Sequence, residues 1–176
     1  MNRMTDKVAV VTGGGSGFGA GIARQFCDEG ARVVLLDLNQ EAAESIAKEL
    51  GETCLPVYAD ISDKSNLSSA IDQIIDWSGK IDILVNNAGV GHEPTPLDEL
   101  SEKQFDRIFQ VNMRGIYLTS NLVVPIMKAK GQGCILNIAS TAGVSPRPNL
   151  TWYNASKGWV ITVSYTHLRA HETATY

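Results

Sequence analysis

Short, uniformly apolar runs recur along the chain between longer amphipathic segments, and this pattern constrains the fold more than any other feature. Runs such as Val-Ala-Val-Val at 8–11 and Val-Val-Leu-Leu at 33–36 do not alternate in polarity. Strands of this kind are covered on both faces, as in a parallel sheet that lies between helices. We predict buried strands at residues 7–12, 32–37, 55–58, 81–86 and 134–138.

The segments between these runs have the pattern of helices. They cover residues 17–29, 40–50, 63–77 and 101–130, with a break near Asn112, and another helix begins near Asn149. Glycines at 30, 51, 79 and 131 are placed to end helices. Strands and helices in this order, with right-handed crossovers, form an α/β fold with a doubly wound parallel sheet.

The composition allows one globular domain. The chain has 176 residues, of which 44% are hydrophobic, enough for a single core. A formal net charge of -4 gives no basic surface for nucleic acid or an anionic membrane, so small molecules are the expected partners. We see no transmembrane segment and expect a cytoplasmic protein. Cys27, Cys54 and Cys134 are interpreted as reduced core residues, and no metal centre is indicated.

A glycine-rich segment, Thr-Gly-Gly-Gly-Ser-Gly-Phe-Gly at 12–19, follows the first predicted strand and opens the first helix. Glycine permits a sharp turn and the close approach of a ligand to the backbone. The helix N-terminus beyond it offers free N–H groups to a pyrophosphate. Any strand-to-helix turn can use one or two glycines, but the position after a strand favours a dinucleotide site. Its expected contacts are Gly13, Ser16, Gly17, Phe18 and Gly19.

Asp37 ends the second predicted strand, about twenty residues past this turn. A carboxylate there can accept hydrogen bonds from both ribose hydroxyls of an adenosine and repels a 2′-phosphate. The alternative is a strand-end acid that only begins the next helix. Neither Ser16 nor Leu38, a further expected cofactor contact, supplies a cation for such a phosphate. We therefore expect NAD as the cofactor rather than NADP.

Three polar side chains near the end of the chain could carry chemistry. Tyr153 and Lys157 lie four residues apart in a predicted helix, so they project from one face. A nearby ammonium stabilises a phenolate and so helps a tyrosine to exchange protons. Ser140 follows the last predicted strand and could hold a substrate oxygen. Taken alone, Tyr153 and Lys157 could be a chance pair on a helix. Ser140 could be a serine that only caps a turn.

Together these motifs form an ordered set. The set comprises Thr12-Gly13 with Gly17 and Gly19, then Asp60-Ile61, Asn86-Asn87-Ala88-Gly89, Asn112, Ser140 and the Tyr153-x-x-x-Lys157 pair. The sequence from about residue 7 to 161 thereby resembles the short-chain dehydrogenase/reductases. The resemblance implies a Rossmann fold, an NAD(P)-dependent oxidoreductase and a homotetrameric parent protein.

The resemblance also implies a role for each catalytic residue. Tyr153 would exchange a proton with the substrate oxygen while hydride passes between substrate and nicotinamide. Lys157 would hold the nicotinamide ribose and stabilise the phenolate, and Ser140 would orient the substrate oxygen. Asn112 would kink its helix and hold a water that links Lys157 to solvent.

Further cofactor contacts follow from the same resemblance. Asp60 and Ile61 would flank the adenine, and Asn87, Ala88 and Gly89 would line the cofactor. For the Asn-Asn-Ala-Gly segment the ordinary alternative is a turn that ends a strand. His92 and Glu93, which follow it, are interpreted as solvated loop residues.

The expected reaction interconverts a secondary alcohol and a ketone. A 3-oxoacyl reductase and a sugar or polyol dehydrogenase are the plausible subtypes. A dinucleotide sensor without turnover is the alternative, but it predicts a broken tetrad, and Asn112, Ser140, Tyr153 and Lys157 are all present.

The chain departs from the family at its C-terminal end. Members run to roughly 250 residues, so we expect two further strands and a substrate lid to be missing. Residues 163–173 abandon the preceding apolar stripe and resemble a sequencing-library adapter translated in frame. We interpret 1–162 as an incomplete catalytic domain and 163–176 as a non-native tail. We expect no meaningful turnover from these 176 residues alone.

Overall fold

The computed structural model describes the backbone of residues 2–169 and the side chains of residues 2–164. The described part forms two compact units, one from the N-terminal segment to Ala88 together with Gly115–Leu136, the other from Gly89–Arg114 together with the chain after Leu136. In chain order the elements are β1 (Val8–Thr12), α1 (Gly17–Asp28), β2 (Arg32–Asp37), α2 (Gln40–Leu50), β3 (Cys54–Tyr58), α3 (Lys64–Ser78), β4 (Ile83–Asn86), α4 (Glu102–Ile108), the π-helical η1 (Phe109–Arg114), α5 (Gly115–Lys130), β5 (Cys134–Asn137), the 3-10 turn η2 (Thr141–Gly143) and α6 (Thr151–Arg169).

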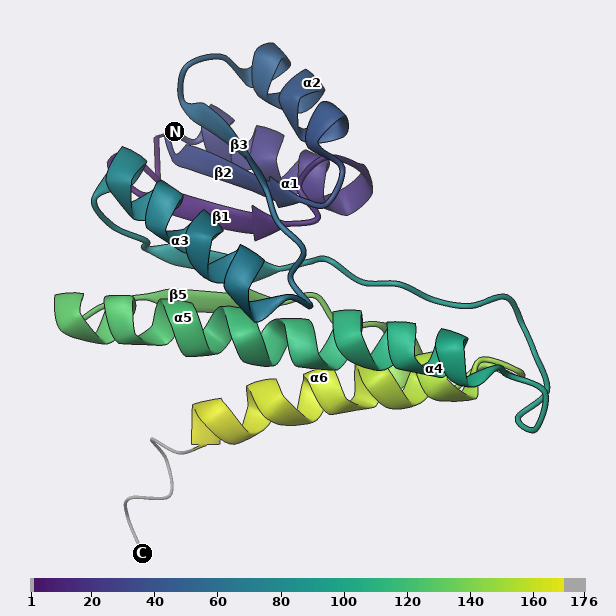
Figure 1. Ribbon diagram of the computed structural model, residues 1–176. Helices are drawn as coiled ribbons and strands as arrows, with labels where there is room; N and C mark the ends of the chain where they lie inside the picture. The colour runs from purple at the N-terminus through teal and green to yellow at the C-terminus, as the bar shows by residue number, and fades with distance from the viewer. Residues whose placement is uncertain (1, 170–176) are drawn as a thin grey trace, which may run out of the picture. The chain divides into compact units, whose positions relative to one another are not determined.

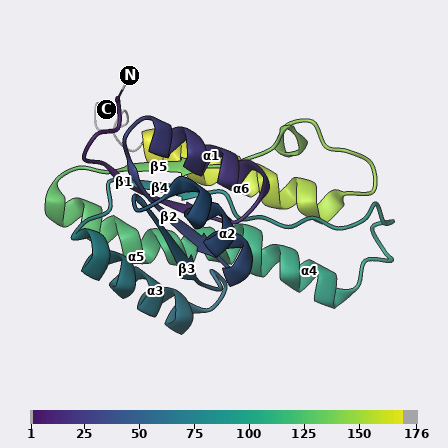
Figure 2. The same cartoon turned by 90° about the horizontal axis from the view of Figure 1, so that it is seen from above.

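The first unit is built around a sheet with the strand order β3-β2-β1-β4-β5. β1 pairs in parallel with β2 and with β4, and β2 pairs in parallel with β3. Helices α1 and α2 pack on one face, and α3 and α5 pack side by side on the other (Figures 1 and 2). Every residue of β1 is buried, as its unbroken apolar run predicts. The predicted doubly wound α/β sheet is confirmed.

Local signals set the ends of the helices. Asn39 and Asp63 cap α2 and α3 by accepting hydrogen bonds from backbone N–H groups of the first turn, and Ser101 forms a capping box with Gln104. All four glycines predicted as helix stops adopt positive φ, and Gly79 is the left-handed C-cap of α3. The helical elements therefore begin and end within two residues of most predicted limits.

A buried carboxylate connects three elements of the first unit. Asp82, 5% exposed, accepts a 2.8 Å hydrogen bond from the N–H of Val8 and pairs with Lys80 at 3.1 Å. Lys130, at the end of α5, contacts the other carboxylate oxygen. Burial raises the pKa of Asp82, but the bonds from Lys130, Val8 and Lys80 outweigh it and lower that pKa to about 2.

Strand β5 corrects one prediction. We predicted a buried strand at 134–138, but its residues alternate between exposed and half-buried, and Leu136 is 46% exposed. The cause is its place at the end of the strand order: within the described residues, only β4 lies beside it. Cys134 is accordingly exposed, contrary to the core position we expected, whereas Cys54 is buried and Cys27 is half-buried.

The second unit contains α4, η1, η2 and α6. Helix α6 packs against η1, η2 and α4, and Phe105 meets Trp152 edge to face with 5.1 Å between ring centroids. The helix break expected near Asn112 is the π-helical segment η1. Helix α6 continues to Arg169, past the predicted start of the tail, because residues 163–169 include neither proline nor glycine. Residues 170–176 of the predicted tail lie outside the described residues.

Among residues 2–169, no helix combines the length and apolarity that a bilayer-spanning segment requires.

Candidate functional site

The glycine-rich turn is packed too closely for a side chain at Gly19. Gly13 adopts φ +64° and donates a 2.8 Å hydrogen bond to the carbonyl of Leu36. A Cβ on Gly19, in the first turn of α1, would lie 2.0 Å from the carbonyl oxygen of Gly13. Position 19 must therefore be glycine for this turn to form.

The N-terminus of α1 is open beside this turn. Ser16 precedes the helix in extended conformation, and its side chain makes no capping bond within the described residues. A Cβ on Gly17 would meet no described atom within 4 Å, and Phe18 is 83% exposed. The first turn carries no acidic residue, so its N–H groups and positive dipole suit a phosphate. The residues present fit the pyrophosphate of a dinucleotide.

Asp37, at the end of β2, makes the contacts that its ordinary sequence interpretation expects, and its role at an adenosine ribose stays a prediction. Its Oδ2 accepts a 2.8 Å hydrogen bond from Gly15 N, and its Oδ1 accepts one of 2.8 Å from Asn39 N. The carboxylate thus holds the glycine turn and starts α2. A carboxylate has about four acceptor positions, which leaves room for ribose hydroxyls. The neighbouring Leu38 is 60% exposed.

The segment after β3 forms its own compact turn. Asp60 Oδ1 accepts hydrogen bonds of 2.8 and 2.6 Å from the N–H and hydroxyl of Ser62. Its backbone N–H donates to Asn66 Oδ1 at 2.7 Å, and Ile61 is 8% exposed. These contacts fix the turn, and the roles expected for Asp60 and Ile61 at an adenine remain predictions.

Asn87 fastens the end of β4 to the glycine turn. Its Nδ2 donates to the carbonyls of Thr12 at 2.9 Å and Gly13 at 3.2 Å. The Thr12 hydroxyl accepts 3.0 Å hydrogen bonds from the N–H groups of Asn87 and Ala88. Sequence reasoning quoted Thr12 as part of the turn but missed this role. A polar residue that ends a buried apolar strand was the available signal.

Asn112 is the centre of a buried network in the second unit. It is 1% exposed, and its Nδ2 donates to Val90 O and to Ser156 Oγ, each at 2.9 Å. Its Oδ1 accepts a 2.8 Å hydrogen bond from Val90 N. Ser156, which sequence reasoning missed, donates in turn to the carbonyl of Tyr153 at 2.8 Å. The network joins η1, the loop at Val90 and the first turn of α6.

Lys157 is a buried amine beside Tyr153. It is 6% exposed, its Nζ donates to Ile138 O at 2.8 Å, and it lies 6.0 Å from the centroid of the Tyr153 ring. Burial lowers the pKa of Lys157. Lys157 forms no ion pair with a carboxylate of the described side chains. When protonated, an amine at this position can stabilise a phenolate that develops on Tyr153.

Ser140 makes the turn-capping bond that its ordinary reading expects. Its Oγ accepts a 3.2 Å hydrogen bond from Ala142 N and begins η2. A Cβ on Gly143 would lie 2.7 Å from the carbonyl carbon of Lys157, so η2 and α6 touch through their backbones. The capping bond leaves the Ser140 hydroxyl hydrogen available to another acceptor.

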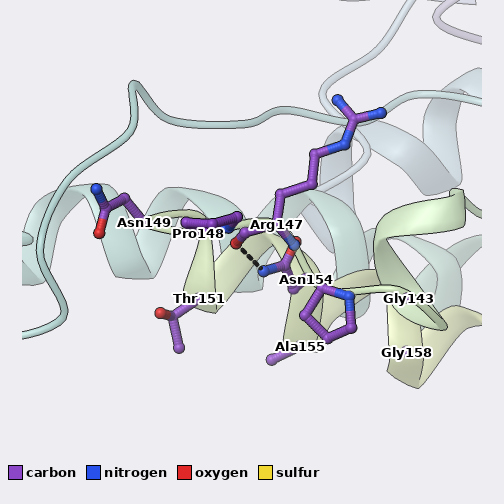
Figure 3. Close-up of a pocket in the computed structure, with 9 residues that line it drawn as sticks. Gly143, Arg147, Pro148, Asn149, Thr151, Asn154, Ala155 and Gly158 are labelled. Carbon is purple, nitrogen blue, oxygen red and sulfur yellow. Dashed lines mark hydrogen bonds between the residues drawn. The ribbon is translucent and has the colours of Figure 1, made fainter.

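An open cavity of about 580 Å³ lies beside the start of α6 (Figure 3). Asn154 shapes it by donating from Nδ2 to Arg147 O at 2.8 Å and accepting from Arg147 N at 3.4 Å. The Arg147 side chain points away from Asn154 in Figure 3. Neither Tyr153 nor Lys157 lines this cavity, which is formed by Gly143, Pro146, Arg147, Pro148, Asn149, Thr151, Asn154, Ala155 and Gly158.

His92 differs from the solvated residue we expected. Its Nδ1 lies 2.8 Å from Glu93 O, and its Nε2 is buried with no hydrogen-bond partner among the described residues. Glu93 is exposed, as predicted.

The structure thus brings the predicted residues together as two groups, one in each unit. Gly13, Gly19, Asn87 and Ala88 meet at the glycine turn, to which Asp37 is also bonded. In the second unit, Asn112 reaches Tyr153 of α6 through Ser156. Lys157 lies beside the Tyr153 ring, and Ser140 begins the turn η2, which packs on α6. Gly89, the first residue of the second unit, is exposed.

Comparison with known proteins shows which family has this combination of a glycine turn and a Tyr-x-x-x-Lys helix. The model of the family described as short chain dehydrogenase matches residues 7–176. The 4-formylbenzenesulfonate dehydrogenase of Comamonas testosteroni is 40% identical over 170 residues, which cover 92% of this chain and 66% of that protein. The chain therefore spans just under two thirds of this relative's length.

Solved structures give the same result. A 3-ketoacyl-(acyl-carrier-protein) reductase from Brucella melitensis, complexed with NADH, matches with TM-score 0.89 and 49% identity over 91% of this chain and 68% of its own. A xylitol dehydrogenase with bound NAD+ matches with TM-score 0.90 and 31% identity over 94% and 65%. By sequence and by fold alike, the chain belongs to the short-chain dehydrogenase/reductase family.

Proposed function

We propose that the protein is an oxidoreductase that interconverts a secondary alcohol and a ketone, with NAD preferred over NADP. Membership of the family supports the reaction class. The relatives with NADH or NAD+ in their structures support the cofactor, and their names support an oxoacyl or polyol substrate. The buried Lys157 amine beside Tyr153 carries the proposal.

Each residue of the second-unit group has a chemical task. The Tyr153 hydroxyl gives a proton to the substrate oxygen during reduction and takes it back during oxidation. Lys157 stabilises the resulting phenolate. The Ser140 hydroxyl hydrogen orients the substrate oxygen. Asn112 holds the loop at Val90 and, through Ser156, the helix turn that carries Tyr153. NAD(H), when bound, accepts or supplies the hydride.

The first-unit group binds the adenosine side of the cofactor. The turn residues Gly13, Ser16, Gly17, Phe18 and Gly19 face the pyrophosphate with backbone N–H groups. Asp37 would accept hydrogen bonds from the ribose hydroxyls. The side chain of Leu38 is uncharged and would not neutralise a 2′-phosphate. Asp60 and Ile61 would flank the adenine. Asn87 and Ala88 form the next part of the cofactor surface in this unit. Gly89, the first residue of the second unit, is a further proposed cofactor contact.

Hydride transfer tests the proposal. NADH oxidation is measured with oxoacyl, sugar and cyclic ketones in the full-length product of the gene and in Tyr153→Phe. Loss of the acid/base should lower kcat by about 10²- to 10⁴-fold. Tyr117→Phe, on an exposed side chain of α5, is the matched control and should keep full activity.

The alternative is a nucleotide sensor. Tight binding of NADH without turnover on any ketone would favour that reading. A Tyr153→Phe variant as active as an active parent would instead contradict the role of Tyr153 as the acid/base. We further propose that the parent protein is a cytoplasmic homotetramer, as the family resemblance implies. Sedimentation of the full-length product tests its oligomeric state.

A further inference from the structure

The turn that carries Ser140 lies directly on the backbone of α6. A Cβ on Gly143 would lie 2.7 Å from the carbonyl carbon of Lys157 and 2.8 Å from the backbone nitrogen of Gly158. Gly143 and Gly158 are accordingly neighbours in Figure 3. Backbone atoms inside a helix cannot yield to a new methyl group unless the helix or the turn moves as a whole. The two segments can therefore touch here only because residue 143 has no side chain.

Glycine is required at position 143 for space and not for its backbone conformation. Gly143 does not adopt positive φ, so alanine could take the same backbone dihedral angles. The opposite side of the contact is less crowded, because a Cβ on Gly158 would lie 3.5 Å from the carbonyl oxygen of Gly143, an ordinary van der Waals contact. The contact thus tolerates a methyl group from α6 and excludes one from η2.

The turn transmits the position of Gly143 to Ser140. The N–H of Gly143 donates a 3.0 Å hydrogen bond to the Ser140 carbonyl, and Ala142 between them is 1% exposed. On the other side of the serine, the carbonyl of Ile138 accepts a 2.8 Å hydrogen bond from Lys157 Nζ. Lys157 therefore holds the Ser140 segment on both sides, with its Nζ at Ile138 and its backbone at Gly143.

We propose that Gly143 is a positioning residue that sets the separation between the Ser140 hydroxyl and the Tyr153 hydroxyl. The inference rests on the proposed function, in which both hydroxyls meet one substrate oxygen. A side chain at position 143 would move η2 and its serine away from α6, and the two hydroxyls would no longer reach the same atom. The fit of the turn on α6 then determines whether the substrate oxygen lies where Tyr153 can exchange a proton with it.

Kinetics of two alanine variants of the full-length gene product test this proposal. Gly143→Ala should lower kcat by about 10²-fold, the loss that a displacement of about 1 Å can cause. NADH affinity should change little, because the glycine turn lies in the other unit. Gly158→Ala is the matched control and should keep its kcat, since its methyl group fits. Circular dichroism at the assay temperature checks that both variants are folded, so that unfolding is not counted as a loss of kcat.

A double-mutant cycle shows whether Gly143 acts through Ser140. Once Ser140→Ala has removed the hydroxyl, Gly143→Ala should lower kcat further by about threefold at most. Losses that multiply in the double variant would overturn the proposal, because Gly143 would then act independently of the serine.

A third substitution separates the backbone contact from side-chain packing. A Cβ at position 143 would also lie 2.8 Å from Cδ1 of Ile161, and valine lacks this atom. Ile161→Val should not restore the kcat of Gly143→Ala, because the conflict with the α6 backbone remains. Full restoration would overturn the proposal.

Crystal structures of the two alanine variants give a readout that does not depend on turnover. Ser140 should lie farther from Lys157 in Gly143→Ala than in the unsubstituted protein, and at an unchanged distance in Gly158→Ala. An unmoved Ser140 in Gly143→Ala would overturn the proposal whether or not the protein reduces a ketone. A displaced Ser140 in a protein whose unsubstituted form reduces no ketone would support the positioning by Gly143 and contradict the proposed function.

Discussion

At the scale of single residues, Asp37 has a structural task and a proposed binding task, and removal of its charge tests the second. Asp37→Asn keeps an oxygen that can accept a backbone hydrogen bond but removes the charge. Hydrogen bonds to charged groups contribute about 1.5–3 kcal/mol, so we expect the preference for NAD over NADP to fall by ten- to a hundredfold.

Nucleotide affinities measured by fluorescence check this expectation. Asp72→Asn removes the charge of an exposed carboxylate on α3 and should change neither affinity. An unchanged ratio of NAD to NADP affinity in Asp37→Asn would count against the role assigned to this residue.

The burial of the Lys157 amine lowers the free energy of unfolding when the amine is charged. Burial lowers its pKa below 10.5, so the folded protein binds fewer protons than the unfolded chain between the two pKa values. The contribution of Lys157 to stability is therefore highest above pH 10.5 and is lost as the pH falls through its lowered pKa. Urea unfolding of the unsubstituted chain and of Lys157→Met at several pH values measures this pH-dependent contribution to the free energy of unfolding.

The free energy of unfolding of the parent should rise relative to Lys157→Met as the pH is raised from neutrality toward 10.5. A difference that is independent of pH would contradict the assignment. The lysine of the proposed reaction is then retained for chemistry and not for stability.

At the scale of secondary structure elements, Asp82 ties the starts of β1 and β4 to the end of α5. Its pKa falls from 3.8 to about 2 on folding. The stabilisation is present above pH 3.8 and is lost as the pH falls through about 2. Asp82→Asn should therefore lose on the order of 2 kcal/mol at pH 7 and almost nothing near pH 2.

Urea unfolding at pH 7, 4 and 2.5 follows this loss. Glu49→Gln removes an exposed partner of Arg24 and serves as the control, since solvent screens that pair. Equal losses for Asp82→Asn at all three pH values would show that the carboxylate charge does not stabilise the fold.

Elements whose limits depend on local signals could be predicted from sequence. The limits of β2 and α2 agree with prediction, and a break near Asn112 was expected where η1 lies. The exposure of β5 was not predicted, because it depends on which strand ends the sheet. Apolar composition alone does not carry that information.

The site shows the same division. Its motif residues could be named from sequence, because each follows a strand or shares a helix face. The partners of these residues could not. The Thr12 hydroxyl binds N–H groups more than seventy residues away, and Asn112 reaches Ser156 across 44 positions. Such bonds depend on the tertiary fold, which no local pattern encodes.

At the scale of the whole molecule, we expect β5, which ends the sheet within the described residues, to promote self-association. Leu136 is 46% exposed on a strand that ends the described sheet, and such edges pair with other chains. Leu136→Lys should reduce self-association measured by light scattering. Leu97→Lys, on a 59% exposed loop residue, is the matched control and should change association little. Equal effects of the two lysines would argue for a general charge effect.

The packing of the glycine turn limits how the protein could evolve. No side chain fits at position 19, and one at position 13 would need a left-handed backbone close to Ala88. Mutations there are removed by steric conflict before any effect on binding can be selected. Ser16 and Leu38 are exposed, so substitutions at these positions meet no such barrier. Adaptation to a different nucleotide would therefore proceed through the rim of the turn while its interior stayed constant.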